Sequence, residues 1–137
     1  MQEITTRSSQ QNELKQNLNL KMTSKSKKAK KVTESTVEQL LRKLVKDCGG
    51  FAYKFTSPGN RSVPDRMCVF PYGLVAFVEC KAPGKEPTKA QLAELTKLRN
   101  LGHFSTWVSN EIEVINFIMS MKDLLAQYKN ALEVERS

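Results

Sequence analysis

Residues 74–81 read Leu-Val-Ala-Phe-Val-Glu-Cys-Lys, an uninterrupted apolar run that ends in a carboxylate and an ammonium group. Five consecutive apolar residues predict a strand that is covered on both faces. Because side chains alternate along a strand, Glu79 and Lys81 share one face and Cys80 lies on the other. Ionised groups at the end of a buried strand are costly unless other groups compensate them. We therefore expect a functional site at this end of the strand.

A second predicted strand, residues 64–70, precedes this one along the chain. The two are joined by Pro71-Tyr72-Gly73, a short segment with turn chemistry. If the loop holds three residues, the register of the hairpin places Asp65 directly opposite Glu79. A one-residue slip in register would separate them.

The predicted register brings two carboxylates together. Directly opposed side chains have Cβ atoms about 4.5 to 5.5 Å apart, so Asp65 and Glu79 repel each other. A shared proton or a bound cation would offset the repulsion. With oxygen ligands only and Lys81 alongside, a hard divalent ion such as Mg²⁺ is the better fit.

Basic residues are concentrated in the first part of the chain. The 137 residues carry a formal net charge of +8, and residues 1–33 hold eight of the 22 Lys and Arg residues but two of the 14 acidic ones. This segment is poor in apolar residues, so it cannot bury enough surface to order itself. We expect a disordered basic arm at residues 1–32 whose charge suits nucleic acid. A solubilising tail and a nuclear-localisation signal are the alternatives.

The sequence also bears on where the protein works. No run approaches the roughly 20 apolar residues needed to span a bilayer, and the N-terminus lacks the apolar core of a secretory signal. The three cysteines fall in apolar patterns without a Cys-x-x-Cys spacing, which indicates buried thiols in a reducing compartment. We expect an intracellular, cytoplasmic protein with no membrane partner, in the host cytoplasm if the source is viral.

Residues 33–137 predict one domain with the element order α-β-β-β-α-β-α. The assignment depends on apolar spacing, turn residues and helix caps. The expected elements are a helix from Thr33 to Gly49-Gly50, strands at residues 51–55, 64–70 and 74–81, a helix from Thr88 to Gly102, a strand at residues 103–108 and a helix capped by Ser109 or Asn110.

Pro64-Asp65, thirteen further residues and then Glu79-Cys80-Lys81 match the PD-(D/E)xK pattern of the restriction-endonuclease-like superfamily. With the element order, the sequence resembles the virus-type replication-repair nuclease (VRR-NUC) family over roughly residues 34–118. The residues that carry the resemblance are Glu38, Gly49-Gly50, Lys54, Ser57-Pro58-Gly59, Val63-Pro64-Asp65, Phe77 to Ala82, and Gln91. The resemblance implies an α/β restriction-endonuclease-like core of order α-β-β-β-α-β, here with an additional C-terminal helix.

The resemblance implies an Mg²⁺- or Mn²⁺-dependent DNA endonuclease that hydrolyses phosphodiester bonds. Asp65 and Glu79 would hold the metal ion together with the main-chain carbonyl of Cys80. Lys81 would orient or help to deprotonate the attacking water, and its charge would favour the developing phosphorane. A surface hairpin with a Glu79–lysine salt bridge is the alternative. Surface pairs contribute only about 0 to 1 kcal/mol, which would not explain charges at the end of a buried strand.

Two further catalytic residues follow from the family pattern. It implies that Glu38 supplies another metal ligand, directly or through water, and that Gln91 steadies the site. Each has a structural alternative, because Ser35 with Glu38 and Thr88 with Gln91 both fit a capping box. Both interpretations stay open for both residues.

Four polar residues on or beside the loop before Asp65 are candidates for DNA binding: Lys54, Ser57, Asn60 and Arg61. Phosphate contacts there would place DNA over the metal ion. A polar loop can also occur without such a role.

The resemblance also bears on substrate and assembly. Stand-alone members of the family resemble Holliday-junction resolvases, which implies branched DNA and a homodimer that places two sites on two strands. The long, Met-rich final helix is the candidate interface. Two alternatives are a non-catalytic nucleic-acid-binding module of the same fold and a restriction-type duplex nuclease. The latter would need an added base-reading element, for which residues 33–137 leave little room.

Overall fold

The computed structural model describes residues 31–137. The elements in chain order are α2 (Glu34–Asp47), β1 (Phe51–Lys54), β2 (Arg66–Val69), η1 (Pro71–Gly73), β3 (Val75–Cys80), α3 (Lys89–Asn100), β4 (Phe104–Val108) and α4 (Glu111–Arg136). The predicted order α-β-β-β-α-β-α is confirmed. The predicted basic arm lies outside the described residues except at its end, where Val32 packs against the core. No helix within residues 31–137 has the length and apolar character required to cross a membrane.

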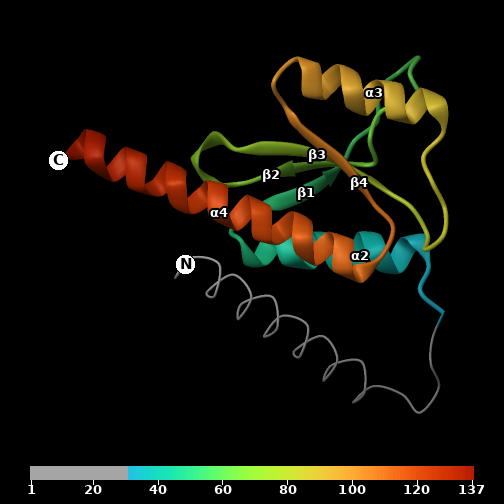
Figure 1. The fold of residues 1–137 in the computed structure, drawn as a ribbon, viewed down its shortest axis with the longest axis horizontal. Coiled ribbons are helices and arrows are strands. Elements are labelled where there is room, and N and C mark those ends of the chain that lie inside the picture. Colours follow the sequence, from blue (N-terminus) through green and yellow to red (C-terminus); the bar gives the residue numbers. More distant parts are fainter. Residues whose placement is uncertain (1–30) are drawn as a thin grey trace, which may run out of the picture.

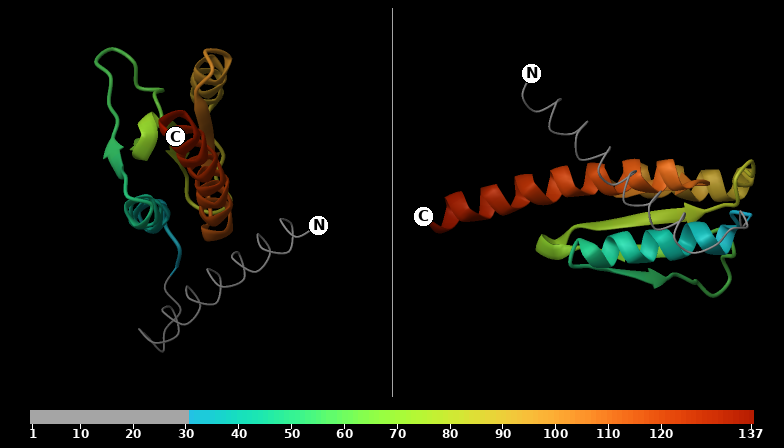
Figure 2. Two further views of the ribbon diagram at one scale, coloured as in Figure 1. Left: turned by 90° about the vertical axis from the view of Figure 1, so that its left-hand side faces the viewer. Right: turned by 90° about the horizontal axis from the view of Figure 1, so that it is seen from below.

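The strands form one mixed sheet in the order β1-β2-β3-β4. β1, β2 and β3 are antiparallel neighbours, and β4 runs parallel to β3. Helices α2 and α4 lie on one face of the sheet and α3 lies on the other, beside β4 (Figures 1 and 2). The hydrophobic core fills the space between the sheet and the α2–α4 pair, with apolar side chains from all three. The fold therefore has the α/β architecture that the sequence predicts.

The register of the β2–β3 hairpin is the predicted one. Arg66 pairs with Val78, and the following pairs continue in step to Val69 and Val75. The connecting turn holds three residues, and the amide of Phe70 donates to the carbonyl of Leu74 at 2.8 Å. Asp65 immediately precedes the first pair, so the turn sets this residue beside Glu79.

β3 is the central element of the sheet, and its two faces differ. Ala76, Val78 and Cys80 are fully buried in the core beneath α2 and α4. Phe77 points to the opposite face, where its ring contacts the rings of Phe55 and His103. Because side chains alternate, Glu79 lies on the same face as Phe77. It is near the end of β3, on the face that α3 covers.

The turn between α2 and β1 depends on a close backbone approach at Gly50. A Cβ atom at this position would lie 2.2 Å from the carbonyl oxygen of Val69. Only glycine fits there without a shift of the backbone, so α2 is held tightly against the first hairpin. This contact keeps the helix and the sheet edge in a fixed relation.

Helix α4 extends beyond the sheet (Figures 1 and 2). Its buried residues all lie between Val114 and Met121. In the following half, Tyr128 is 37% exposed and Val134 is 74% exposed. The distal half of α4 therefore presents apolar side chains that the domain itself does not cover.

Candidate active site

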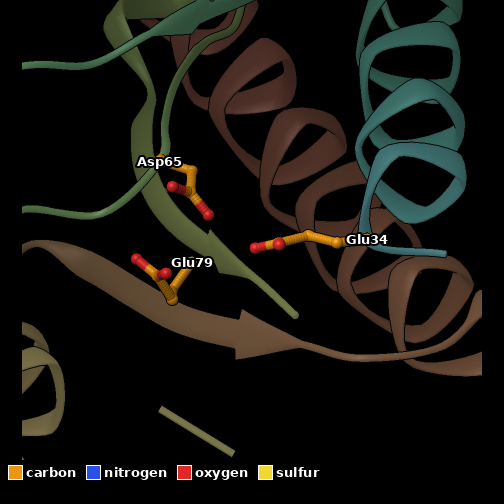
Figure 3. Close-up of side chains that lie close together, drawn as sticks. All are labelled: Glu34, Asp65 and Glu79. Atoms are coloured by element: carbon orange, nitrogen blue, oxygen red, sulfur yellow. The ribbon is translucent and has the colours of Figure 1, made fainter. Parts of the chain in front are cut away.

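Three carboxylates from different elements converge at one end of the sheet. Glu34 lies in the first turn of α2, Asp65 lies just before β2 and Glu79 lies near the end of β3. Figure 3 shows the three side chains pointing toward a common centre. One oxygen from each carboxylate lies within 4.8 Å of the other two.

The side chain of Asp65 is held by the backbone of the neighbouring strand. The amide of Cys80 donates to Asp65 Oδ2 at 3.0 Å. The main-chain carbonyl of Asp65 accepts from the amide of Phe55 at 2.8 Å, which ties the residue to the segment that follows β1. The amide of Cys80 thus fixes the carboxylate of Asp65, and the amide of Phe55 fixes its main chain.

Glu79 is the most deeply buried of the three, with a side chain that is 2% exposed. Its Oε1 atom accepts from Gln91 Nε2 at 3.2 Å and lies 3.6 Å from Lys81 Nζ. Its Oε2 atom is buried and has no hydrogen-bond partner within residues 31–137. A buried carboxylate oxygen without a donor costs stability, so this atom calls for a partner.

The cluster raises the pKa of two of its members. Burial and the negative charge of Asp65 raise the pKa of Glu79 to about 7, and the ammonium group of Lys81 opposes the increase only in part. Partial burial and the charge of Asp65 also raise the pKa of Glu34. Protonation thus relieves part of the repulsion between the carboxylates. A bound cation would relieve it in place of the proton.

The residues present fit a divalent cation. Carboxylate oxygens are the ligands that Mg²⁺ prefers, and three of them face one centre. The unpartnered Oε2 atom of Glu79 offers a further reason, because a cation would supply the missing interaction. Asp65 and Glu79 could hold Mg²⁺ or Mn²⁺, with Glu34 as a third ligand.

Helix α2 begins earlier than the capping box of Ser35 with Glu38 requires, and that alternative is wrong. The N-cap is Thr33, whose hydroxyl accepts from the amide of Thr36 at 3.3 Å, while Thr36 Oγ1 accepts from the amide of Thr33. The hydroxyls of Thr33 and Thr36 therefore form the capping box that was predicted for Ser35 and Glu38. The earlier start places Glu34 in the first turn.

Glu38 lies one turn further along the same face of α2. Its Oε2 atom is 2.7 Å from the Nη2 atom of Arg66, which directly follows Asp65 and points toward α2. The carboxylate of Glu38 is thus committed to an ion pair, while Glu34 faces the other two acids. The metal-ligand role predicted for Glu38 stays a prediction, and Glu34 is the residue that the sequence interpretation missed. Its position among the first-turn acids of an amphipathic helix was the available signal.

Gln91 combines the two roles that the sequence left open. Its Oε1 atom accepts from the amide of Thr88 at 2.9 Å, and the hydroxyl of Thr88 accepts from the amide of Gln91 at 3.1 Å, so the predicted capping box of α3 is confirmed. Its Nε2 atom donates to Glu79. One amide therefore starts a helix and holds a carboxylate of the cluster.

The remaining predicted residues lie around this centre. Lys81 is 18% exposed and directly follows Cys80, whose side chain is fully buried. The catalytic role of Lys81 and the ligand role of the Cys80 carbonyl stay predictions.

The loop before Asp65 is tied to α3. Asn60 Nδ2 donates to Glu94 Oε1 at 2.6 Å, and Asn60 Oδ1 accepts from the amide of Ser62. Ser57 forms an isolated bridge with Asn60. Lys54 and Arg61 are exposed, so their charges face solvent. DNA contacts by these residues stay predictions.

Comparisons with known proteins bear on the fold and on the class of protein. No protein-family model matches the chain. The protein named "Putative nuclease p44" of Acyrthosiphon pisum secondary endosymbiont phage 1 is 51% identical over 72 residues, which cover 53% of this chain and 77% of that protein. A solved structure named "VRR_NUC domain" is 24% identical with a TM-score of 0.57, and the match covers 64% of this chain and 94% of that one.

Glu79→Gln is expected to stabilise the metal-free protein at pH 8 by on the order of 2 kcal/mol. The pKa of Glu79 is about 7 in the folded chain and 4.5 ordinarily, so between these values the folded state binds more protons than the unfolded state. Stability therefore falls as the pH rises through this window, and glutamine cannot ionise. Urea unfolding in EDTA should show the gain at pH 8 and little difference at pH 5.

The exposed Glu86 supplies the matched control, because Glu86→Gln should leave stability unchanged at both pH values. If Glu79→Gln were as stable as the native chain at pH 8, the buried carboxylate would not carry the cost assigned to it.

Proposed function

This chain belongs to the VRR-NUC nuclease family, and from that premise we propose that it is a metal-dependent DNA endonuclease that cuts branched DNA. The observation that carries the proposal is the convergence of Glu34, Asp65 and Glu79, with one buried oxygen of Glu79 left without a partner. Three close carboxylates, of which Glu79 is buried, repel one another, and a divalent cation is the group that would offset their repulsion. Mg²⁺ or Mn²⁺ fits such oxygen donors.

In this proposal Asp65, Glu79 and Glu34 hold the cation, with the Cys80 carbonyl as a further ligand. When bound, the ion would neutralise charge on the phosphate and activate a water molecule for hydrolysis. The protein fixes this arrangement before substrate binds, because the Cys80 amide orients Asp65 and the Gln91 amide orients Glu79. Preorganised ligands need no rearrangement during the reaction.

Lys81 supplies positive charge at the reacting phosphate. Its Nζ atom lies 3.6 Å from Glu79 Oε1, which keeps the ammonium group beside the carboxylates. From there it would donate a hydrogen bond to the attacking water or to a phosphate oxygen, and its charge would stabilise the transition state.

The DNA would approach over the loop between β1 and β2. Lys54 and Arg61 carry exposed positive charge beside the site, and such residues bind phosphate without reading sequence. The basic arm at residues 1–32 would add non-specific affinity, and residues 33–137 would form the catalytic domain. We propose that both act in the cytoplasm of the host cell.

A homodimer would place two such sites on two strands of one junction. The distal half of α4 carries uncovered apolar residues, among them Tyr128 and Val134. Burial of these side chains against a second copy would remove apolar surface from water. We therefore propose the distal half of α4 as the dimer interface.

Glu34→Gln is expected to weaken the binding of Mn²⁺ by about tenfold or more. Glu38→Gln should leave the affinity for Mn²⁺ within about twofold and instead lower the melting temperature, because it leaves Arg66 without its partner. Isothermal titration calorimetry and thermal unfolding measure the two effects. If Glu38→Gln weakened Mn²⁺ binding by about tenfold and Glu34→Gln did not weaken it, Glu38 would be the ligand instead.

Cleavage of a labelled four-way junction tests the activity itself. The native chain should make paired nicks with Mg²⁺ or Mn²⁺, with no cleavage in EDTA and slower cleavage of matched linear duplex and single strand. Lys81→Ala should reduce the rate by about 100-fold or more, whereas Lys85→Ala, on the exposed loop that follows, should not. DNA that is bound but never cut would support the non-catalytic binding module. Equal rates on duplex and junction would support a duplex nuclease.

Sedimentation at micromolar concentration tests the interface. The native chain should sediment as a dimer, and the double variant Tyr128→Asp/Val134→Asp should sediment as a monomer because charge cannot be buried in an apolar interface without cost. Asn130→Asp adds charge to an exposed position of the same segment and is the control. A monomeric native chain would rule out this assembly.

A further inference from the structure

A hollow of about 520 Å³ lies between α2 and β1, at the edge of the sheet farthest from β4. It is lined by Gln39, Arg42, Lys43 and Lys46 of α2 and by Phe51, Ala52 and Tyr53 of β1. β1 is an edge strand, so one of its sides has no neighbouring strand within the described sheet.

The α2 wall of the hollow is positively charged. Arg42 and Lys46 are exposed and four residues apart, so they share one face of the helix with Gln39 and Lys43. Like charges at this spacing destabilise a helix slightly. No acidic residue of the described chain lines the hollow. The wall therefore suits an anion that bridges successive turns of the helix.

The β1 side of the hollow carries two aromatic residues, which alternate with Ala52 along the strand and so project from its other face at the sheet edge. Phe51 is 58% exposed and Tyr53 is 53% exposed, and their ring centroids lie 6.0 Å apart with the planes tilted by 35°. Two large rings on an edge strand are a liability for aggregation unless a partner uses them. Exposed rings next to cations are the combination that binds unpaired nucleotides, because bases stack on the rings while the cations contact phosphates.

Both walls lead toward the carboxylate cluster. α2 begins at Glu34, and Arg42 lies about 12 Å further along the helix axis. β1 runs the opposite way, from Phe51 to Lys54, which pairs with Arg66 next to Asp65. A strand in the hollow would thus lie about 10 to 20 Å from the cluster, within a few nucleotides of the cleaved bond.

We propose that this hollow binds a single-stranded segment of the DNA that the nuclease cuts. The inference rests on the proposed function, because it takes the polyanion to be the substrate of the neighbouring site. An acidic peptide would satisfy the cations but would leave the exposed ring pair without planar partners. An unpaired strand at a branch or a flap offers phosphates to the cations of α2 and bases to the rings of β1.

Fluorescence anisotropy of labelled oligodeoxythymidylate of 20 nucleotides tests the proposal, with the full chain in EDTA at several NaCl concentrations. Arg42→Ala/Lys46→Ala and Phe51→Ala/Tyr53→Ala should each bind about tenfold more weakly or worse. The cation variant should also reduce the salt slope by about 1.4, since each phosphate contact to a single strand contributes about 0.7. The aromatic variant should leave the slope unchanged.

Matched controls remove similar groups elsewhere. Lys129→Ala/Arg136→Ala removes two exposed cations at the far end of α4, and Phe104→Ala removes a partly exposed ring from β4. Both should bind the oligonucleotide like the native chain, and circular dichroism should confirm that every variant is folded. If Arg42→Ala/Lys46→Ala and Phe51→Ala/Tyr53→Ala both bound the oligonucleotide within twofold of the native affinity, the proposal would be overturned. Loss of polyglutamate binding with unchanged oligonucleotide binding would assign the hollow to an acidic protein instead.

The outcome is separable from that of the proposed function. Binding is measured without metal, so it does not depend on cleavage. If the native chain cuts no DNA but the two double variants of the hollow still bind the oligonucleotide more weakly, the hollow is a DNA-binding site and the endonuclease assignment is wrong. If the chain cuts DNA and the two double variants of the hollow bind the oligonucleotide like the native chain, only the proposal that the hollow binds DNA is wrong.

Discussion

The mutual repulsion of three close carboxylates, one of them buried, is the constraint on which the organisation of this domain depends. Asp65 and Glu79 are brought together by the β2–β3 register, and Glu34 reaches them from the start of α2. Burial and the charge of Asp65 raise the pKa of both Glu79 and Glu34. The surrounding contacts hold them in place despite that cost. The Cys80 amide holds Asp65 and the Gln91 amide holds Glu79, so the site is assembled by the same backbone and helix-cap interactions that assemble the fold.

Much of this arrangement could be predicted from the sequence because it follows from local rules. A three-residue turn with glycine at its end determines the register of the hairpin, and the register determines which residues face each other. The pairing of Asp65 with Glu79 therefore needed no information from distant parts of the chain. The start of α3 at Thr88 followed in the same way, since a capping box is complete within four residues.

The errors and omissions concern contacts between elements that are far apart in the sequence. Thr33, Ser35 and Thr36 offer several hydroxyl groups near the start of α2, and local chemistry does not choose between them. The start of α2 at Thr33 brings Glu34 into the helix on the same face as Glu38, and only contacts with the strands decide which of the two acids meets the other carboxylates. Nothing in the sequence near Glu38 indicates Arg66, 28 positions later, as its partner. The hollow beside β1 likewise arises only once α2 is folded back against the sheet edge.

The double use of Gln91 restricts which side chains evolution can place at this position. For helix capping alone, glutamate and glutamine at the third helical residue are equivalent, and such exchanges are expected to be common. Here the same side chain must donate a hydrogen bond to Glu79, which a carboxylate cannot do when ionised. Glutamate would also add a fourth negative charge to the cluster. An ordinary helix cap has thus become a position where two chemically similar residues are no longer interchangeable, so an exchange that looks neutral in an alignment would be selected against.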